Sequence, residues 1–142
     1  MKICVQHPNS QIKPQSNEVP VKLNELSDIQ NSSCVSVYLS DCLDFIPLNE
    51  RTSLIDIAIL KLRQGGDLII DGADIFAISH ALQSGIRSIE TLNNVLFNGK
   101  LSADSVISVV NYIEKNDNMT VISYKVDSLH YTIKARRKNA NR

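Results

Sequence analysis

The fold is decided by residues 54–71, LIDIAILKLRQGGDLIID. The first part has the spacing of a helix for which Asn49 is the expected N-cap, and its apolar residues form one stripe: Leu54, Ile55, Ala58, Ile59 and Leu62. Gly65-Gly66 is expected to end this helix, because glycine tolerates the left-handed conformation that reverses the chain. The apolar run 67–71 is typical of a strand buried on both faces of a parallel sheet, and we place it at the sheet centre.

Strand patterns lie on both sides of this stretch. Residues 34–39, CVSVYL, are rich in β-branched and aromatic residues and predict a strand. The resulting strand-helix-strand unit requires a right-handed parallel crossover. Residues 2–5 predict another short strand, while 120–126 and 129–135 alternate in polarity and predict an antiparallel hairpin around Asp127-Ser128.

Three more helices are expected between the central strand and the hairpin. Two cover residues 73–82 and 89–97 and are separated by Gly85. Ser102 is the expected cap of the third, in which four apolar residues have helical spacing: Val106, Ile107, Val110 and Ile113. The fold class is therefore α/β, with a mixed, mainly parallel sheet that is flanked by helices and ends in an antiparallel hairpin.

The composition suits one globular domain. The chain has 142 residues, of which 43% are apolar and 21% charged. We assign residues 1–136 to the domain and 137–142 to a basic tail, because five of the fifteen Lys and Arg residues fall in 134–142, which contains no Asp or Glu. A solvated tail is the simpler interpretation, and contact with phosphates or an acidic partner is the alternative. The chain has no Trp and few aromatic residues to stack on bases, so we expect no nucleic-acid partner beyond the tail.

The cysteines and the apolar runs bear on the location. Cys4, Cys34 and Cys42 lack C-x-x-C spacing, so we expect buried, reduced thiols instead of disulfides or a zinc site. The first apolar run is too short for a signal peptide, and no stretch is long enough to span a membrane. We therefore expect a cytoplasmic protein.

Two segments carry a resemblance to a known family. In residues 58–70, AILKLRQGGDLII, a helix leads through a short linker and Gly-Gly into a strand, and residues 38–47, YLSDCLDFIP, follow the preceding strand. With the closing hairpin, they resemble the carboxyl half of Rossmann-like class I S-adenosylmethionine-dependent methyltransferases. The resemblance covers about residues 34–136. It implies a Rossmann-like sheet with a reduced amino-terminal half, and S-adenosylmethionine as the cofactor.

The amino-terminal part departs from that family. There the first strand leads into a glycine-rich turn beside the cofactor, and an acidic residue after the second strand binds the ribose. Here residues 6–10, QHPNS, contain no glycine, and the first glycine of the chain is Gly65. Residues 6–33 are also too few for the usual helix, strand and helix. Glu25 and Asp28 are the acidic residues in this segment that could bind a ribose.

Three aspartates are the candidate cofactor-binding residues. Asp41 and Asp44 follow the strand 34–39, and Asp71 ends the predicted central strand. Carboxyl ends of parallel strands meet at one edge, where open α/β sheets bind ligands. The simpler alternative is a polar loop and a helix cap formed by the same residues. The cluster is too loose to predict a metal ion.

No catalytic residue can be assigned from the sequence. His7, His80 and His130 have no partner at a recognisable spacing, so we interpret all three as structural. Two functions remain open. One is methyl transfer from S-adenosylmethionine to an unknown acceptor. The other is a non-catalytic remnant that serves as an interaction module, either with another protein or as a homo-oligomer that covers the edge and an apolar face of a shortened sheet.

Overall fold

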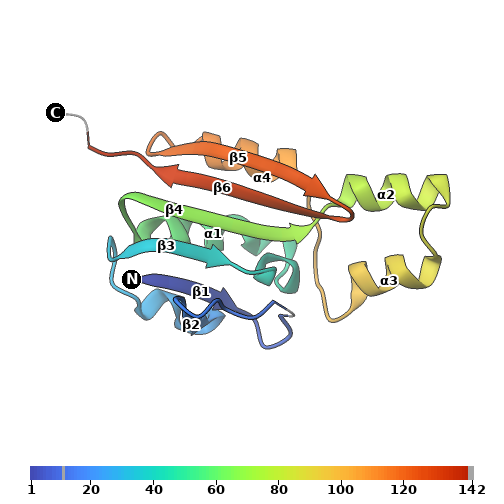
Figure 1. Cartoon of the computed structure of the whole chain (residues 1–142), viewed down its shortest axis with the longest axis horizontal. Helices are drawn as coiled ribbons and strands as arrows, with labels where there is room; N and C mark the ends of the chain where they lie inside the picture. The colour runs from blue at the N-terminus through green and yellow to red at the C-terminus, as the bar shows by residue number, and fades with distance from the viewer. Residues whose placement is uncertain (11, 141–142) are drawn as a thin grey trace.

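A single six-stranded sheet organises the molecule in the order β2-β1-β3-β4-β6-β5 (Figure 1). The computed structural model describes residues 1–10 and 12–140. Strands β2, β1, β3 and β4 are parallel, and β6 is antiparallel to both β4 and β5. The strands are β1 (Lys2–Gln6), β2 (Val19–Lys22), β3 (Cys34–Leu39), β4 (Leu62–Ala73), β5 (Met119–Asp127) and β6 (His130–Arg137). The predicted mixed, mainly parallel sheet with its closing hairpin is confirmed.

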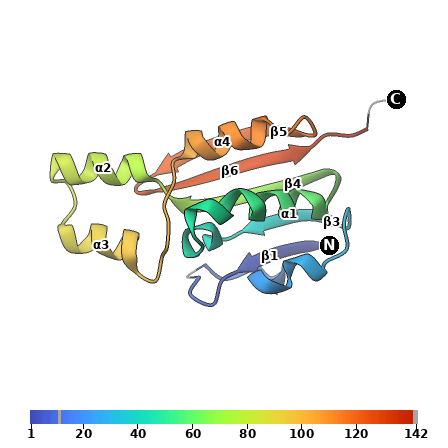
Figure 2. The ribbon, with the colours of Figure 1, turned by 180° about the vertical axis from the view of Figure 1, so that it is seen from behind.

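The helices lie on one face of this sheet and beyond its end. Figure 2 shows α1 and α4 across one face, whereas Figure 1 shows the opposite face without a helix over it. Helices α2 and α3 run antiparallel to each other and project past the sheet as an arm. The helices are α1 (Arg51–Lys61), α2 (Ile75–Ser84), α3 (Ile89–Phe97) and α4 (Val106–Glu114), with short 3-10 helices η1 (Leu23–Asp28), η2 (Cys42–Phe45) and η3 (Leu48–Glu50).

Alternation along the strands separates an apolar face from a polar one. Leu39, Ile70 and Ile133 are register partners on β3, β4 and β6, and all three are fully buried in the core beneath the helices. Neighbouring positions in the strands point the other way. On the uncovered face these include Tyr38 and Thr132, which line a polar hollow. The sheet can therefore leave one face in water without exposing its core.

The two consecutive glycines do not end the helix, which corrects the prediction. Helix α1 already ends at Lys61, and β4 begins at Leu62. Between the register pairs Cys34↔Leu62 and Ser36↔Asp67, β3 has one residue and β4 has four, 63–66, so the glycines form a bulge within β4. Gly65 has φ +77°, and a Cβ on Gly66 would lie 2.9 Å from the backbone oxygens of Arg63 and Cys34. Glycine is required by the bulge.

Helix starts also differ from the predictions. Helix α1 begins at Arg51 behind η3, not directly after Asn49, and η2 occupies part of the predicted loop 41–47. Ser105, not Ser102, caps α4, because its Oγ accepts a 3.1 Å hydrogen bond from the Ser108 backbone N–H. The Ser102 hydroxyl instead donates to the Ile46 carbonyl at 2.8 Å. Ile107 was expected on the buried stripe and is 48% exposed.

Further observations concern the cysteines, the segment between β1 and β3, and the carboxyl end. Cys4, Cys34 and Cys42 are buried and free of disulfides. The segment between β1 and β3 holds only a four-residue strand and the 3-10 helix η1 among the elements of the described residues. At the other end, β6 extends to Arg137, and Arg142 lies outside the described residues. Within residues 1–10 and 12–140, no helix is long and apolar enough to cross a membrane.

Candidate functional site

A groove lies at the carboxyl ends of β1 and β2. It has a volume of about 1020 Å³ and is lined by the turn after β1 and by the start of η1 after β2. In the strand order β2-β1-β3-β4, the chain leaves β1 toward β2 and leaves β3 toward β4, so the connections diverge between β1 and β3, and the groove borders this point through the turn after β1. Ligands bind at such a switch point in open α/β sheets. The groove is large enough for a ligand the size of a nucleoside.

The turn after β1 is held by its own hydrogen bonds. The Ser10 backbone N–H donates to the His7 carbonyl at 2.9 Å, and the Ser10 hydroxyl donates to the Ser40 carbonyl at 3.2 Å. The His7 ring stacks on Phe45 with the centroids 4.9 Å apart, and its Nδ1 accepts from the Asn9 backbone N–H at 3.1 Å. These contacts fix the orientation of His7, which also lines the groove, so its structural interpretation stays a prediction.

The second wall of the groove supplies a carboxylate. Glu25 follows β2 by three residues, is exposed and lines the groove. Asp28, on the same 3-10 helix, is exposed but does not line it. Of the two acidic residues that the sequence offered for a ribose, the structure therefore favours Glu25. Apolar surface from Pro8, Pro20 and Leu23 completes the lining.

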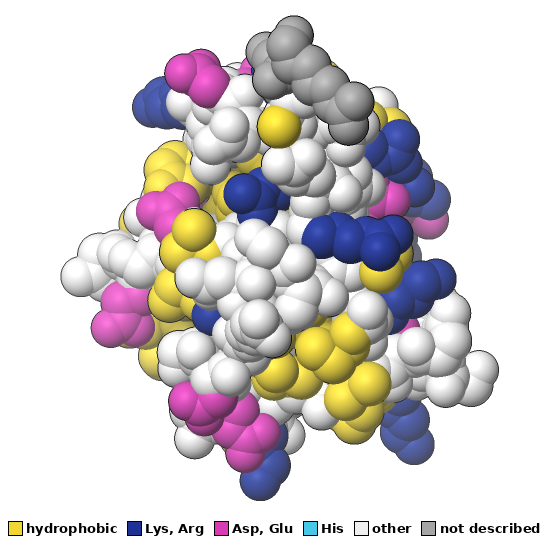
Figure 3. Space-filling model, turned by 90° about the vertical axis from the view of Figure 1, so that its left-hand side faces the viewer, with side chains coloured by type: hydrophobic (Ala, Val, Ile, Leu, Met, Phe, Trp, Pro, Cys, Tyr) yellow, Lys and Arg dark blue, Asp and Glu magenta, His cyan; other side chains and the backbone are white. Residues whose placement is uncertain are grey.

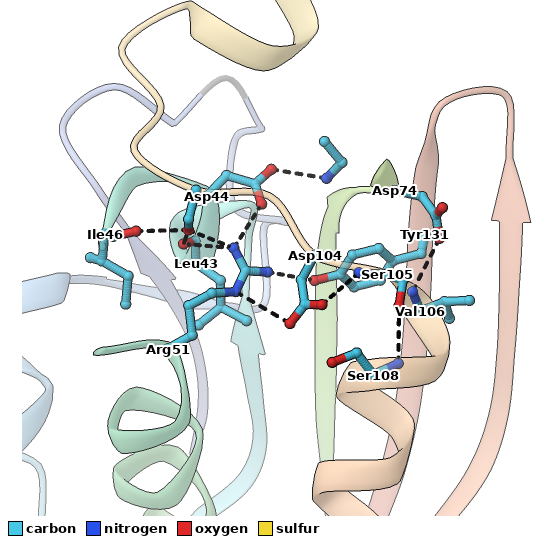
Figure 4. A network of polar contacts seen from close by, with 12 residues as sticks. Leu43, Asp44, Ile46, Arg51, Asp74, Asp104, Ser105, Val106, Ser108 and Tyr131 are labelled. Carbon is cyan, nitrogen blue, oxygen red and sulfur yellow. Dashed lines mark hydrogen bonds and ion pairs between the residues drawn. The ribbon is translucent and has the colours of Figure 1, made fainter. Parts of the chain in front are cut away.

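Asp44 lies in a buried network of charges beside the groove (Figure 4). It is fully buried, and its Oδ1 is 3.3 Å from Arg51 Nη1, while Arg51 is only 3% exposed. Its Oδ2 accepts from the Ala73 backbone N–H at 2.9 Å and lies 3.6 Å from Lys100 Nζ. Arg51 also donates to the Tyr131 hydroxyl at 3.1 Å. Both carboxylate oxygens of Asp44 thus have partners within the protein.

The segment between α3 and α4 closes the carboxyl end of β3. The Leu101 and Ser102 backbone N–H groups donate to the Asp44 carbonyl at 2.8 and 3.2 Å. Arg51 Nη1 donates to the Ser102 hydroxyl at 2.9 Å. Asp74 caps α2 by accepting from Ala77, and it also accepts from the Val106 backbone N–H at 3.1 Å. This part of the sheet edge is therefore filled by the chain itself.

Asp71 lies elsewhere, on the uncovered face of the sheet. Strand β4 continues to Ala73, so Asp71 does not end the strand as predicted. It lines a hollow of about 370 Å³ with Tyr38, whose hydroxyl donates to its carboxylate. Figure 3 shows Lys and Arg side chains gathered along the right-hand margin, where this face is seen edge-on. The hollow is a second, separate polar surface.

The three predicted aspartates are thus not brought together. Asp41 is buried, with a left-handed φ of 48° just ahead of η2. Asp44 is engaged by Arg51, and Asp71 faces the opposite side of the sheet. None of them lines the groove. Their role as cofactor ligands stays a prediction. The groove is lined by other residues, which the sequence did not identify as the main cofactor-binding candidates. Among the described residues, no group of three or more His, Cys, Asp or Glu is placed to hold a metal ion.

Burial changes the acidity of several groups. It raises the pKa of the Cys4 thiol to about 11, helped by the charge of Glu18, so this thiol is protonated and inert at neutral pH. Burial also raises the pKa of Tyr38 and of Tyr131. The pKa of Asp71 is raised by burial as well, against the opposing effect of hydrogen bonds from Tyr38 and Thr132.

The raised pKa of Asp71 predicts a pH-dependent stability. The folded state holds the proton to a higher pH than the unfolded chain, whose carboxyl has its ordinary pKa of 3.8. The stabilisation from Asp71 is therefore present below pH 3.8 and is lost as the pH rises through the folded-state pKa. The side chain of Asp71→Asn cannot ionise. The free energy of unfolding of this variant should therefore increase relative to that of the original chain as the pH rises through the folded-state pKa of Asp71. Urea unfolding at a series of pH values measures this difference, and a difference that is independent of pH would contradict it.

Comparison with known proteins bears on the fold. No family model and no curated protein matches the sequence. An O-methyltransferase family protein from Burkholderia thailandensis matches 88% of this chain and 36% of its own, with TM-score 0.61 and 16% identity. A SAM-dependent methyltransferase from Archaeoglobus fulgidus matches 87% and 69%, with TM-score 0.57 and 10% identity. Magnesium protoporphyrin IX methyltransferase from Synechocystis, solved with bound SAH, matches 85% and 52%, with TM-score 0.58 and 15% identity.

The chain spans about a third to two thirds of the length of these three structures, while most of its own length is matched. The expected likeness to methyltransferases is therefore confirmed for the fold, and it extends beyond residues 34–136 to the amino-terminal strands. This chain has a shortened form of the class I S-adenosylmethionine-dependent methyltransferase fold.

Proposed function

We propose that the chain binds S-adenosylmethionine in the groove at the carboxyl ends of β1 and β2, and that it serves methyl transfer to an acceptor. The position of the groove carries this proposal. It shares the turn after β1 with the switch point between β1 and β3, the part of the sheet edge where α/β proteins of this kind bind nucleotide-like ligands. The structural neighbours, one of them solved with SAH, support the choice of cofactor.

The groove residues fit the chemical groups of this cofactor. The Glu25 carboxylate can accept hydrogen bonds from the ribose hydroxyls, and Lys22 offers a positive charge to the carboxylate of the methionine part. Pro8, Pro20 and Leu23 offer apolar surface to the adenine. The turn 7–10 has no glycine, so we assign binding mainly to side chains instead of a closely approached backbone. When bound, the cofactor supplies an activated methyl group on its sulfonium.

A specific observation favours a second function, binding without catalysis. The carboxyl end of β3 lies next to the groove, and the segment 99–102 is bonded across it through Asp44 and Arg51. An acceptor that approaches from this side would have to displace these contacts. The alternative function is therefore to bind the cofactor or its product without turnover. An assay of methyl transfer distinguishes this alternative from the catalytic function.

Replacing Glu25 tests the proposal. Glu25→Ala should weaken binding of S-adenosylhomocysteine about 10- to 100-fold, because a hydrogen bond to a charged group contributes roughly 1.5–3 kcal/mol. Asp28→Ala is the matched control, since Asp28 is an exposed acid on the same 3-10 helix that does not line the groove. Its affinity should stay within about twofold of the original, as expected for a surface change away from the ligand. Equal effects of the two variants in calorimetric titration would show that binding, if present, does not use this wall.

A further inference from the structure

Exposed apolar side chains gather on the arm that α2 and α3 form. Six large ones between residues 75 and 97 are 41–70% exposed: Ile75, Phe76, Leu82, Ile86, Ile89 and Phe97. The arm has a small core of its own, in which Ile78 and Ala81 of α2 pack near Leu92 of α3. A layer of two helices buries only the sides that face each other and the sheet. The remaining apolar surface is larger than a solvated arm requires.

The helical repeat places most of these side chains on one side of the arm. Successive residues of an α-helix are about 100° apart around its axis. On α2, Ile75 and Leu82 therefore lie about 80° around the axis from the mean direction of the buried Ile78 and Ala81. Ile89 lies about 60° around α3 from Leu92 in the same rotational sense. Because α2 and α3 run antiparallel (Figure 1), equal rotations bring both sets to the same face. This arm face consists of Ile75, Leu82 and Ile89, with Ile86 in the turn between the helices and Phe97 at its border, about 140° around α3 from Leu92 in the same sense.

The charge of the arm suits contact with an identical surface. Between residues 75 and 97, Arg87 and Glu90 are the charged side chains, and they cancel. Arg87 is engaged by the Ser128 hydroxyl at 2.8 Å. Two copies of this surface therefore do not repel each other. A strongly basic or acidic partner would meet no opposite net charge on it.

We propose that the arm face packs against the arm face of a second copy of this chain across a twofold axis. Two antiparallel helix pairs stacked through their apolar faces make a four-helix arrangement, which buries what each pair alone exposes. A twofold axis makes the contact self-complementary and closed. Five side chains that each expose roughly 100 Å² amount to about 500 Å² per copy and about 1,000 Å² in total, which is the size of a weak biological interface.

This interface differs from the one that the sequence suggested. The expected contact was at an edge and an apolar face of the sheet, and the edge strand β5 does expose Ile122, Tyr124 and Val126, but the arm carries the more exposed apolar side chains, such as Ile86 and Ile89. The cofactor groove is formed by other elements, after β1 and β2. Dimer formation and cofactor binding can therefore be tested separately.

Sedimentation velocity of the full chain over a range of concentrations tests the proposal. The original protein should sediment as a dimer, at twice its 15.8 kDa, at tens of micromolar. Leu82→Glu should shift it to the monomer, with a dissociation constant at least 10-fold higher. Leu60→Glu is the matched control: Leu60 is on helix α1 and is 54% exposed, against 57% for Leu82, and this variant should remain a dimer.

Circular dichroism melts of both variants confirm that each is folded, and Ile89→Glu repeats the test on the other helix. A monomer at hundreds of micromolar in the original protein would overturn the proposal. So would a dimer that persists in both folded arm variants, or one that Leu60→Glu disrupts as strongly as Leu82→Glu does.

Discussion

Asp44→Ala should lower the free energy of unfolding by about 3–5 kcal/mol, because the buried Arg51 guanidinium loses its closer carboxylate and keeps Asp104, which is 4.0 Å from its Nε. Arg51 is 3% exposed, so water cannot replace the lost carboxylate. The Ala73 backbone N–H would lose its acceptor, and Lys100 its partner, in the same change. Chemical denaturation followed by circular dichroism measures the loss.

Two further variants separate this charge effect from simple side-chain truncation. Asp67→Ala removes a second Asp–Arg pair, but Arg136 is exposed, so solvent should compensate for most of the loss. In the double variant Asp44→Ala/Arg51→Met, the buried guanidinium is removed as well, so stability should recover part of the loss, while Lys100, 11% exposed, still lacks Asp44. A double variant that loses the full sum of the two single changes would contradict this view of the network.

Ile70→Ala should cost about 2–5 kcal/mol, the range for truncation of a large buried aliphatic side chain. Ile70 is fully buried between Leu39 and Ile133 on the face that α1 and α4 cover. Ile69→Ala is the matched control, because Ile69 is the next residue of the same strand, faces the uncovered side and is only partly buried. Its cost should stay below about 1 kcal/mol. Similar losses for the two variants would indicate that both faces of the sheet are covered.

The central crossover could be predicted from the sequence because local and tertiary preferences agree there. The buried positions of α1 and the start of β4 follow the apolar stripe from Leu54 to Leu62. The glycine pair was interpreted as a helix stop, because glycine is common both at the ends of helices and in β-bulges. Only the register between β3 and β4 distinguishes the two. A bulge depends on a neighbouring strand, and single-strand periodicity carries no information about it.

The site was harder to predict because its parts come from distant segments. Arg51 lies three, four and seven residues before Leu54, Ile55 and Ala58, so it continues their apolar stripe, and this spacing was the available signal for a buried charge. The ion pair between Lys100 and Asp44 depends on how the segment before α4 crosses the sheet edge, and the contact of Arg51 with Tyr131 depends on the position of β6. No local pattern encodes that path.

The uncovered sheet face and the apolar arm show a similar limit. The polar alternation of β6 was visible in the sequence, but whether its outer face meets a helix or water depends on which elements the tertiary fold places over it. The apolar residues of α2 and α3 have the spacing of core helices. In this chain there is too little neighbouring structure to cover them, so part of that surface stays exposed.

The central claim is that the groove after β1 and β2 binds S-adenosylmethionine, and amide chemical shifts in ¹H–¹⁵N spectra test it most directly. Titration with S-adenosylhomocysteine should shift amides of the groove segments 6–10 and 20–25, while those of β5 and the arm stay in place. Saturation in the micromolar range would agree with the account. Unchanged spectra at millimolar ligand, or shifts confined to the hollow around Tyr38 and Asp71, would contradict it.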